Sequence, residues 1–349
     1  MTHEEIKTVD RSNMYDLLLT FPDQVKAAVE IGNSSTISLT SKGIEQVVLT
    51  GLGGSAIGGD ILRSYLAGEL RVPFLVNRNY TLPEFVGPNT LVIVSSYSGN
   101  TEETNAAHRE ALKRHAKILC ISSNGATERL AKARRSSFVK VPGGLPPRAA
   151  LGYSFFPVLI ALTKLKLIKE KKVDIRETIA LLKRKTDEYA NAGSAQNQAL
   201  LLAQQLRGHV GVLYSSSERF DAVNTRWRGQ MAENAKTLTF GNFLPEMNHN
   251  ELVGWKTLGE QMRDIQVLFL RDKDDHKRIQ IRMNITKEVI AGYTAHVTEV
   301  WSEGRSLLAR TFSLICLGDW VSFYLAILHG EDPTPISVIE YLKKELGKL

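Results

Sequence analysis

The chain has 349 residues, which is more than one ordinary core needs and comfortable for two domains. Hydrophobic residues make up 43% and charged residues 23%, a balance that excludes a disordered or collagen-like chain. The net charge of +7 suits either nucleic acid or an anionic small molecule. Because the basic residues are spread along the chain without interleaved aromatic residues, we expect a phosphorylated metabolite and no nucleic acid.

The sequence predicts a cytoplasmic protein without a membrane partner. The most apolar run, 311–328, is interrupted by Gly318 and Asp319, and the acidic N-terminus lacks the apolar stretch of a signal peptide. Both cysteines, Cys120 and Cys316, lie in apolar runs without the spacing of a zinc site or a disulfide framework. We therefore expect them to be buried as small hydrophobic side chains.

The first half of the chain predicts a helix followed by an alternation of strands and helices. Residues 1–30 carry apolar residues at helical spacing. Strands are expected at 47–49, 74–76, 91–94, 118–121 and 138–141, with helices at 57–66 and 101–112. Continuous apolar strands that alternate with helices indicate a parallel sheet covered on both faces. In such sheets, ligand sites lie at the carboxyl ends of the strands.

The second half predicts a similar domain after a helical connection. Residues 148–206 are mostly helical, and then strands are expected at 210–214, 267–270 and 297–301, with helices at 221–235 and 277–285 and from 307 and 336. We therefore expect an N-terminal helix (1–30), a first α/β domain (31–160), a helical connection (161–205) and a second α/β domain with C-terminal helices (206–349).

A glycine-rich turn, 51–60 (Gly-Leu-Gly-Gly-Ser-Ala-Ile-Gly-Gly-Asp), follows the first predicted strand. Glycines let backbone N–H groups approach an anion, and the following helix presents its positive N-terminus. The spacing Gly51-x-Gly53-x-x-Ala56 also fits the dinucleotide fingerprint. Arg78, after the second strand, could bind the 2′-phosphate of NADP, so an NADP-dependent oxidoreductase stays open at this turn.

A second polar turn, 95–104 (Ser-Ser-Tyr-Ser-Gly-Asn-Thr-Glu-Glu-Thr), follows the third predicted strand. Ser96, Ser98 and Thr101, with Gly99 between them, place three hydroxyls where a helix begins. Each hydroxyl alone could simply cap the helix. Together with the backbone N–H groups, however, they can converge on one phosphate, and a dinucleotide enzyme has no need of this second cradle.

These two turns resemble those of the sugar isomerase (SIS) domain, which binds phosphosugars. The resemblance implies that the substrate phosphate is bound by Gly54, Ser55, Ser96, Ser98 and Thr101. It also implies an α/β fold of two SIS-type, doubly wound, flavodoxin-like domains, with parallel sheets flanked by helices.

Later segments resemble one branch of SIS proteins, the bifunctional phosphoglucose/phosphomannose isomerase family. They are 147–153 (Pro-Arg-Ala-Ala-Leu-Gly-Tyr), 233–236 (Glu-Asn-Ala-Lys), 245–255 (Pro-Glu-Met-Asn-His-Asn-Glu-Leu-Val-Gly-Trp), 332–336 (Asp-Pro-Thr-Pro-Ile) and 342–344 (Leu-Lys-Lys). The resemblance runs from about residue 45 to the end of the chain, and 256–304 carries little of it.

The resemblance implies an isomerase that interconverts glucose 6-phosphate and mannose 6-phosphate with fructose 6-phosphate through an enediolate, without a metal or other cofactor. Glu233 matches the family's base, which moves the proton between C1 and C2. Arg148 matches the cation beside the enediolate. His249 matches the residue that opens the sugar ring; it comes from a second subunit, which implies a homodimer with shared sites. Lys343 fits the C-terminal lysine better than Lys344.

Other phosphosugar proteins remain as alternatives. A non-catalytic SIS regulator would carry a DNA-binding or nucleotide-binding module, and 1–30 is too short for one. The amidotransferase-linked isomerase that makes glucosamine 6-phosphate has an N-terminal catalytic cysteine, which this chain lacks. His249 has no second His or Cys at ligand spacing, which separates the chain from zinc-dependent mannose-phosphate isomerases.

Overall fold

The computed structural model describes residues 1–348, and the chain divides into two compact units. The first-sheet unit comprises 20–180 and 306–309, and the second-sheet unit comprises 1–19, 181–305 and the described residues from 310 onward. This division differs from the expected boundaries. The expected connection, 161–205, is not a separate element, because the division falls inside one helix, α8 (Lys172–Ala190).

The N-terminal segment, 1–30, does not form the single expected helix. It contains α1 (His3–Val9) and α2 (Met14–Leu19), and then enters α3 (Phe21–Ser34). Asp10 ends α1, and its carboxylate accepts hydrogen bonds from the first backbone N–H groups of α2, at 2.8 Å from Met14 N. Pro22 lies in the first turn of α3, where a missing N–H is tolerated, so it starts a new helix.

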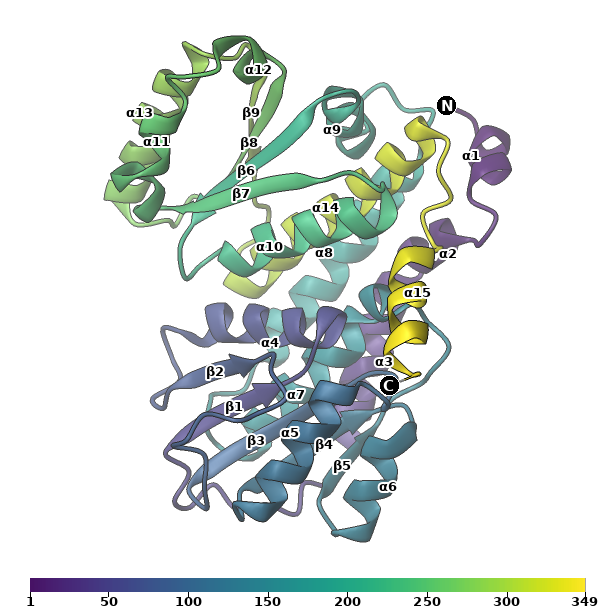
Figure 1. The fold of residues 1–349 in the computed structure, drawn as a ribbon, viewed down its shortest axis with the longest axis vertical. Helices are drawn as coiled ribbons and strands as arrows, with labels where there is room; N and C mark the ends of the chain where they lie inside the picture. Colours follow the sequence, from purple (N-terminus) through teal and green to yellow (C-terminus); the bar gives the residue numbers. More distant parts are fainter. Residues whose placement is uncertain (349) are drawn as a thin grey trace. The chain divides into compact units, whose positions relative to one another are not determined.

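The first sheet has five parallel strands in the order β2-β1-β3-β4-β5 (Figure 1). Their bounds are β1 Gln46–Thr50, β2 Phe74–Asn77, β3 Thr90–Ser96, β4 Lys117–Ser122 and β5 Ser137–Lys140. The helices that cover them are α4 (Gly53–Leu66), α5 (Glu102–Lys113), α6 (Gly125–Ala133) and α7 (Leu151–Lys164), with α3 packed on α7. The strand order reverses between β1 and β3, as in flavodoxin-like folds, so the doubly wound prediction is confirmed.

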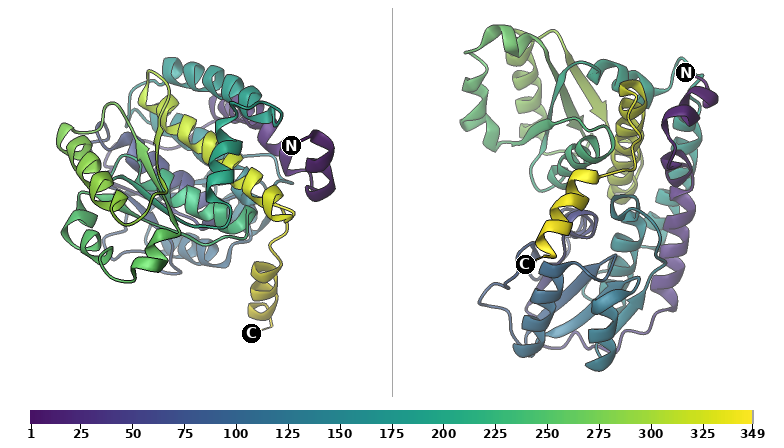
Figure 2. Two further views of the ribbon diagram at one scale, coloured as in Figure 1. Left: turned by 90° about the horizontal axis from the view of Figure 1, so that it is seen from above. Right: turned by 45° about the vertical axis from the view of Figure 1, so that its right-hand side comes forward.

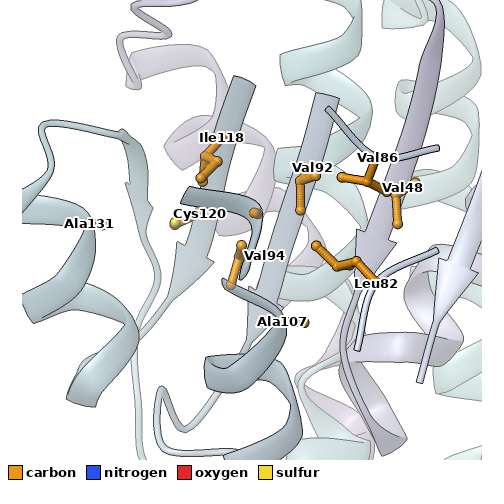
Figure 3. Close-up of a cluster of buried hydrophobic side chains, with 10 residues drawn as sticks. Val48, Leu82, Val86, Val92, Val94, Ala107, Ile118, Cys120 and Ala131 are labelled. Atoms are coloured by element: carbon orange, nitrogen blue, oxygen red, sulfur yellow. The ribbon is translucent and has the colours of Figure 1, made fainter. Parts of the chain in front are cut away.

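Side chains alternate between the two faces of this sheet and build a core on each. On the face covered by α5 and α6, the side chains of Val48, Val92, Val94, Ile118 and Cys120 pack together with Leu82, Val86, Ala107 and Ala131 (Figure 3). On the opposite face, α4 lies so close that a Cβ at Gly59 would be 2.8 Å from Leu49 Cδ2. The predicted burial of Cys120 is confirmed.

One ionisable side chain, His108, is enclosed in the α5 face of this core. Its Nε2 lies 3.6 Å from Cys120 Sγ, and Nδ1 has no hydrogen-bond partner within residues 1–348. Burial disfavours the imidazolium and lowers the pKa of His108 from 6.5 to about 4. The folded protein therefore keeps this side chain neutral at a pH where the unfolded chain protonates it.

Acidification is expected to destabilise the fold through His108. Between pH 6.5 and 4 the unfolded chain binds the proton and the folded chain does not, so stability falls as the pH falls, by about 3 kcal/mol for this group. The free energy of unfolding in urea, measured for the wild type and for His108→Leu at pH 7 and at pH 4, tests this loss of stability. The variant should lose about 3 kcal/mol less than the wild type between these pH values. Parallel losses would show that His108 titrates normally.

The second sheet has four parallel strands in the order β7-β6-β8-β9, which repeats the reversal of the first. Their bounds are β6 Val210–Ser216, β7 Thr239–Leu244, β8 Ile265–Arg271 and β9 Val297–Trp301. The longer helices of this unit are α9 (Gln198–Leu206), α10 (Asp221–Asn234), α13 (Lys277–Ala291) and α14 (Leu307–His329), and the short ones are η2 (Glu246–His249), α11 (Glu251–Gly254) and α12 (Gly259–Arg263). A final helix, α15 (Ser337–Leu346), follows α14 through an extended segment (Figure 2).

The helix α14 is long and apolar enough to cross a membrane by length and composition, but 94% of its most apolar window is buried inside the protein. It is continuous through Gly318 and Asp319, which interrupt the apolar run of the sequence but not the helix expected from residue 307. Gly318 gives room to the Trp227 ring, since a Cβ there would lie 2.3 Å from its Nε1. Asp319 is bound by Arg226. Both residues therefore serve packing between α10 and α14 within the core.

The Arg226–Asp319 pair is expected to be a large contributor to stability. The guanidinium donates to the carboxylate at 2.7 and 3.1 Å, and Gln230 donates at 2.9 Å. Asp319→Asn would leave the buried Arg226 charge without its carboxylate, at a cost of about 3–5 kcal/mol. Asp187→Asn, which removes the exposed ion pair with Lys183, is the matched control and should cost less than about 1 kcal/mol. Equal losses of unfolding free energy in both variants would contradict the prediction.

Candidate active site

The two polar turns predicted to hold phosphate meet at the switch point of the first sheet. They follow β1 and β3, which are neighbours, with Thr50 paired to Val94. The backbone N–H of Tyr97, in the second turn, donates to Ser55 Oγ in the first turn at 3.2 Å. Open α/β sheets bind ligands in the crevice at such a switch point. The fold therefore joins two turns that are 42 residues apart in the sequence into one site.

Each of these turns leads into a helix whose N-terminus faces the same edge of the sheet. The first leads into α4, which begins at Gly53 with a φ of +50°, a conformation that favours glycine. The second leads into α5, for which Thr101 is the N-terminal capping residue. Unpaired backbone N–H groups and a positive helix end are the features that bind phosphate.

The hydroxyls of the second turn lie together around Gly99. Ser96 Oγ lies 3.3 Å from Thr101 Oγ1, and Ser98 Oγ accepts from the backbone N–H of Asn100 at 3.4 Å. Ser96 is buried, whereas Ser98 is exposed and free to turn toward a ligand. The structure thus brings together the four hydroxyl residues that the sequence predicted as phosphate ligands, Ser55, Ser96, Ser98 and Thr101.

The conformation of the second phosphate turn is held by residues that do not belong to the turn. Gly99 has a φ of +71°, and its carbonyl oxygen accepts from Thr127 N at 3.0 Å and Asn105 Nδ2 at 3.3 Å. A Cβ at Gly99 would lie 1.7 Å from Asn124 O, so no other residue fits. The sequence pattern did not point to Asn105 or Thr127, because neither belongs to the turn.

Arg148 lies beside the first turn, on the 3₁₀ helix η1 (Pro147–Ala149). A Cβ at Gly54 would lie 2.3 Å from Pro147 O and 3.1 Å from Arg148 N, so only glycine permits this approach. Arg148 is almost fully buried, at 3% exposure of the residue. The backbone of a buried arginine thus packs against the first phosphate turn.

The other predicted catalytic residues belong to the second-sheet unit. Glu233 is half-buried in the last turn of α10, and its backbone oxygen accepts from Lys236 Nζ at 2.6 Å. His249 is exposed at the end of η2, directly after β7 and Pro245. Lys343 and Lys344 are both exposed in the last turn of α15. The site residues are thus divided between the units: the phosphate turns and Arg148 in one, and Glu233, His249 and Lys343 in the other.

The switch point of the second sheet, between β6 and β8, is occupied by the protein's own carboxylates. Buried Asp272 accepts from Ser302 Oγ at 2.6 Å, from Arg310 Nε at 2.8 Å and from Arg219 Nη2 at 3.0 Å. Although burial opposes ionisation, these hydrogen bonds and the two arginines hold the pKa of Asp272 below its usual range. Asp275 accepts from Ser216 Oγ at 2.7 Å. The two arginines and the serine hydroxyls at this switch point are therefore bound to the protein's own carboxylates.

The position of the Arg78 side chain bears on the NADP alternative. Arg78, the candidate for an NADP 2′-phosphate, forms an ion pair with Asp60. Within residues 1–348, no group of three or more His, Cys, Asp or Glu side chains is placed to hold a metal ion. The residues that converge at the first-sheet switch point are instead hydroxyls, backbone N–H groups and an arginine.

Sequence models of two protein families match the chain. The SIS domain model matches residues 39–134, which include both phosphate turns. The model described as the bacterial phospho-glucose isomerase C-terminal SIS domain matches residues 195–346, which include Glu233, His249 and Lys343. The two matches thus cover the predicted site residues of each unit, except Arg148.

Several curated relatives are named bifunctional phosphoglucose/phosphomannose isomerase. The protein from Caldicellulosiruptor bescii is 41% identical over 96% of this chain and 99% of its own length. The one from Aquifex aeolicus is 37% identical over 86% of this chain and 90% of its own length. Among solved structures, a hypothetical protein from Thermus thermophilus superposes on this chain with a TM-score of 0.72 at 16% sequence identity. The superposition covers 98% of this chain and 94% of that one, and it shows a similar fold.

Proposed function

Because the chain belongs to the bifunctional phosphoglucose/phosphomannose isomerase family, we propose that it interconverts glucose 6-phosphate and mannose 6-phosphate with fructose 6-phosphate. The observation that supports this most is the pair of phosphate turns at the first-sheet switch point, with the backbone of Pro147 and of buried Arg148 packed against Gly54. A phosphate cradle with an adjacent fixed cation suits a substrate that carries a phosphate and develops a second negative charge during the reaction.

The phosphate of the substrate binds at the turns, through Gly54 and four hydroxyl groups, next to the turn that carries Arg148. The phosphate-binding hydroxyls are those of Ser55, Ser96, Ser98 and Thr101. The two helix N-termini and the positive net charge favour the anion and steer it to the site.

Isomerisation is a proton transfer between C2 and C1 of the open-chain sugar. The Glu233 carboxylate removes the proton from C2 of the aldose and returns it to C1, while the hydroxyl proton of O2 passes to O1, which gives the ketose. The intermediate enediolate carries negative charge on oxygen, and the Arg148 guanidinium stabilises it. A carbon acid is weak, so both groups must be held close to the two carbons.

Hexose 6-phosphates exist mainly as rings, which must open before the proton can move. His249 serves as the acid–base group at the ring oxygen, since an imidazole can both donate and accept a proton. His249 is exposed at the end of η2, so its side chain is accessible to a second subunit. Lys343, on the exposed helix α15, adds a further positive charge for the phosphosugar.

The functional form in this proposal is a homodimer in which His249 of the partner subunit completes each site. Mixing inactive Glu233→Gln and His249→Ala proteins tests this directly. Subunit exchange gives hybrid dimers with one intact site, and about a quarter of the wild-type activity should return. No recovery after exchange, with dimers shown by light scattering, would assign His249 to its own subunit.

The proposed enzyme is cytoplasmic, needs no cofactor, and catalyses a step of carbohydrate metabolism that serves glycolysis and gluconeogenesis. Steady-state rates on glucose 6-phosphate and mannose 6-phosphate, measured side by side with a chelator present, test the proposal. Turnover of both is expected. Tight binding of fructose 6-phosphate without turnover would favour a non-catalytic regulator, and an NADPH fluorescence change on titration would favour the oxidoreductase.

A further inference from the structure

The turn that carries Arg148 is attached to the phosphate site through Tyr97. This tyrosine lies in the second phosphate turn, and its phenol oxygen accepts a hydrogen bond from the backbone N–H of Leu145 at 3.2 Å. Its own backbone N–H donates to Ser55 Oγ at 3.2 Å. Tyr97 thus touches both phosphate turns and the segment three residues before Arg148.

Tyr97 is also held firmly in place by its neighbours. Its carbonyl oxygen accepts from Ser123 N at 3.1 Å and from Ser123 Oγ at 2.6 Å. The side chain is buried, at 7% exposure, and burial raises the pKa of the phenol, so the hydroxyl stays neutral. A rigid, neutral phenol at a fixed position can define where the segment that donates to it lies.

The other end of the Arg148 turn is bound by Gln24, on α3. Its amide nitrogen donates to Ala149 O at 2.8 Å, and its amide oxygen accepts from Gly152 N at 2.9 Å. A Cβ at Gly152 would lie 2.7 Å from this oxygen, so glycine permits the approach. One side chain therefore bridges η1 and the first turn of α7.

We infer that Tyr97 and Gln24 are positioning residues that set the location of Arg148 relative to the bound phosphosugar. The inference rests on the proposed role of Arg148 at the enediolate. Tyr97 holds the chain before Arg148, and Gln24 holds the chain after it. The contact between Gly54 and Pro147 sets how closely this segment approaches the first phosphate turn. Neither positioning side chain has to touch the substrate for this role.

The inference predicts a specific kinetic signature. Displacing Arg148 by a fraction of an ångström weakens stabilisation of the enediolate, which forms only in the transition state, and so lowers kcat. The phosphate turns keep their backbone N–H groups and hydroxyls in Tyr97→Phe, because the bonds made by the Tyr97 backbone remain. Binding of phosphate should then be nearly unchanged.

The test measures kcat and KM for fructose 6-phosphate, and the competitive inhibition constant of inorganic phosphate, for Tyr97→Phe and Gln24→Leu. In each variant kcat should fall by about tenfold, with the phosphate constant within about twofold of the wild type. The decisive step repeats Tyr97→Phe in an Arg148→Ala background. If Tyr97 acts through Arg148, it should cause no further loss there, because coupled residues are not additive.

Tyr65→Phe is the matched control. It removes another buried phenol of the same unit, whose hydroxyl donates to Asp174 at 3.0 Å, and should leave kcat unchanged. A normal kcat in Tyr97→Phe and Gln24→Leu, or a full tenfold loss on top of Arg148→Ala, overturns the inference. Full activity of Arg148→Ala alone would instead contradict the proposed role of Arg148, so the two failures are distinguishable.

Discussion

The Glu233→Gln variant is expected to lose about a thousandfold in kcat for isomerisation while keeping its affinity for the phosphosugar. Glutamine has the size and shape of glutamate but cannot accept the C2 proton. Glu233 lies in the last turn of α10, so the substitution leaves the helix and its packing in place. The loss should be of similar size with glucose 6-phosphate and with mannose 6-phosphate, because the same base serves both.

The matched control is Glu288→Gln, on an exposed position of α13 in the same unit. It makes the same chemical change away from the proposed site and should leave kcat and KM unchanged. Inhibition by inorganic phosphate should be equal in both variants and the wild type, which shows that the phosphate turns are intact. A Glu233→Gln protein with wild-type kcat would assign the proton transfer to another residue.

The Gly54→Ala variant is expected to lose about a hundredfold in kcat/KM, with part of the loss in phosphate affinity. The added Cβ would lie 2.3 Å from Pro147 O and 2.7 Å from Pro147 C, which are backbone atoms that no rotamer change can move. The first phosphate turn and the Arg148 turn must therefore separate. Both the anion cradle and the cation beside it move from their positions.

Gly87→Ala is the control for this prediction. Gly87 belongs to the same unit and has nothing within 4 Å of an added Cβ, so the substitution should be neutral in kinetics and stability. Thermal unfolding of both variants separates a kinetic effect from a loss of fold. Wild-type kinetics in Gly54→Ala would mean that the contact between the two turns has no bearing on catalysis.

Much of the fold was predictable, because the signals are local. The strands 47–49 and 91–94 are continuous apolar runs, and each ends in a polar turn, so their place in a buried parallel sheet follows from the sequence. The helix α6 was not expected, because its buried residues are few, Thr127 and Ala131. The break at Asp10 was also missed, since it depends on which backbone groups the carboxylate caps.

The same distinction applies to the site. The phosphate turns could be found because their glycines and hydroxyls are adjacent in the sequence. The support of Arg148 could not be found, because the contacts of Leu145 with Tyr97 and of Ala149 with Gln24 join residues 48 and 125 positions apart. The carboxylates at the second switch point did leave a visible signal, since Asp272 to Asp275 come directly after an apolar strand.

The central claim, one proton transfer that serves both aldoses, is tested most directly with fructose 6-phosphate in D2O. The purified protein is incubated with this single substrate, and the products are followed by proton NMR. Glucose 6-phosphate and mannose 6-phosphate should both appear with deuterium at C2, because the proton held by the carboxylate exchanges with solvent, and Glu233→Gln should form neither. Absence of any aldose with the wild-type protein, or undiminished formation of both by Glu233→Gln, would contradict the account.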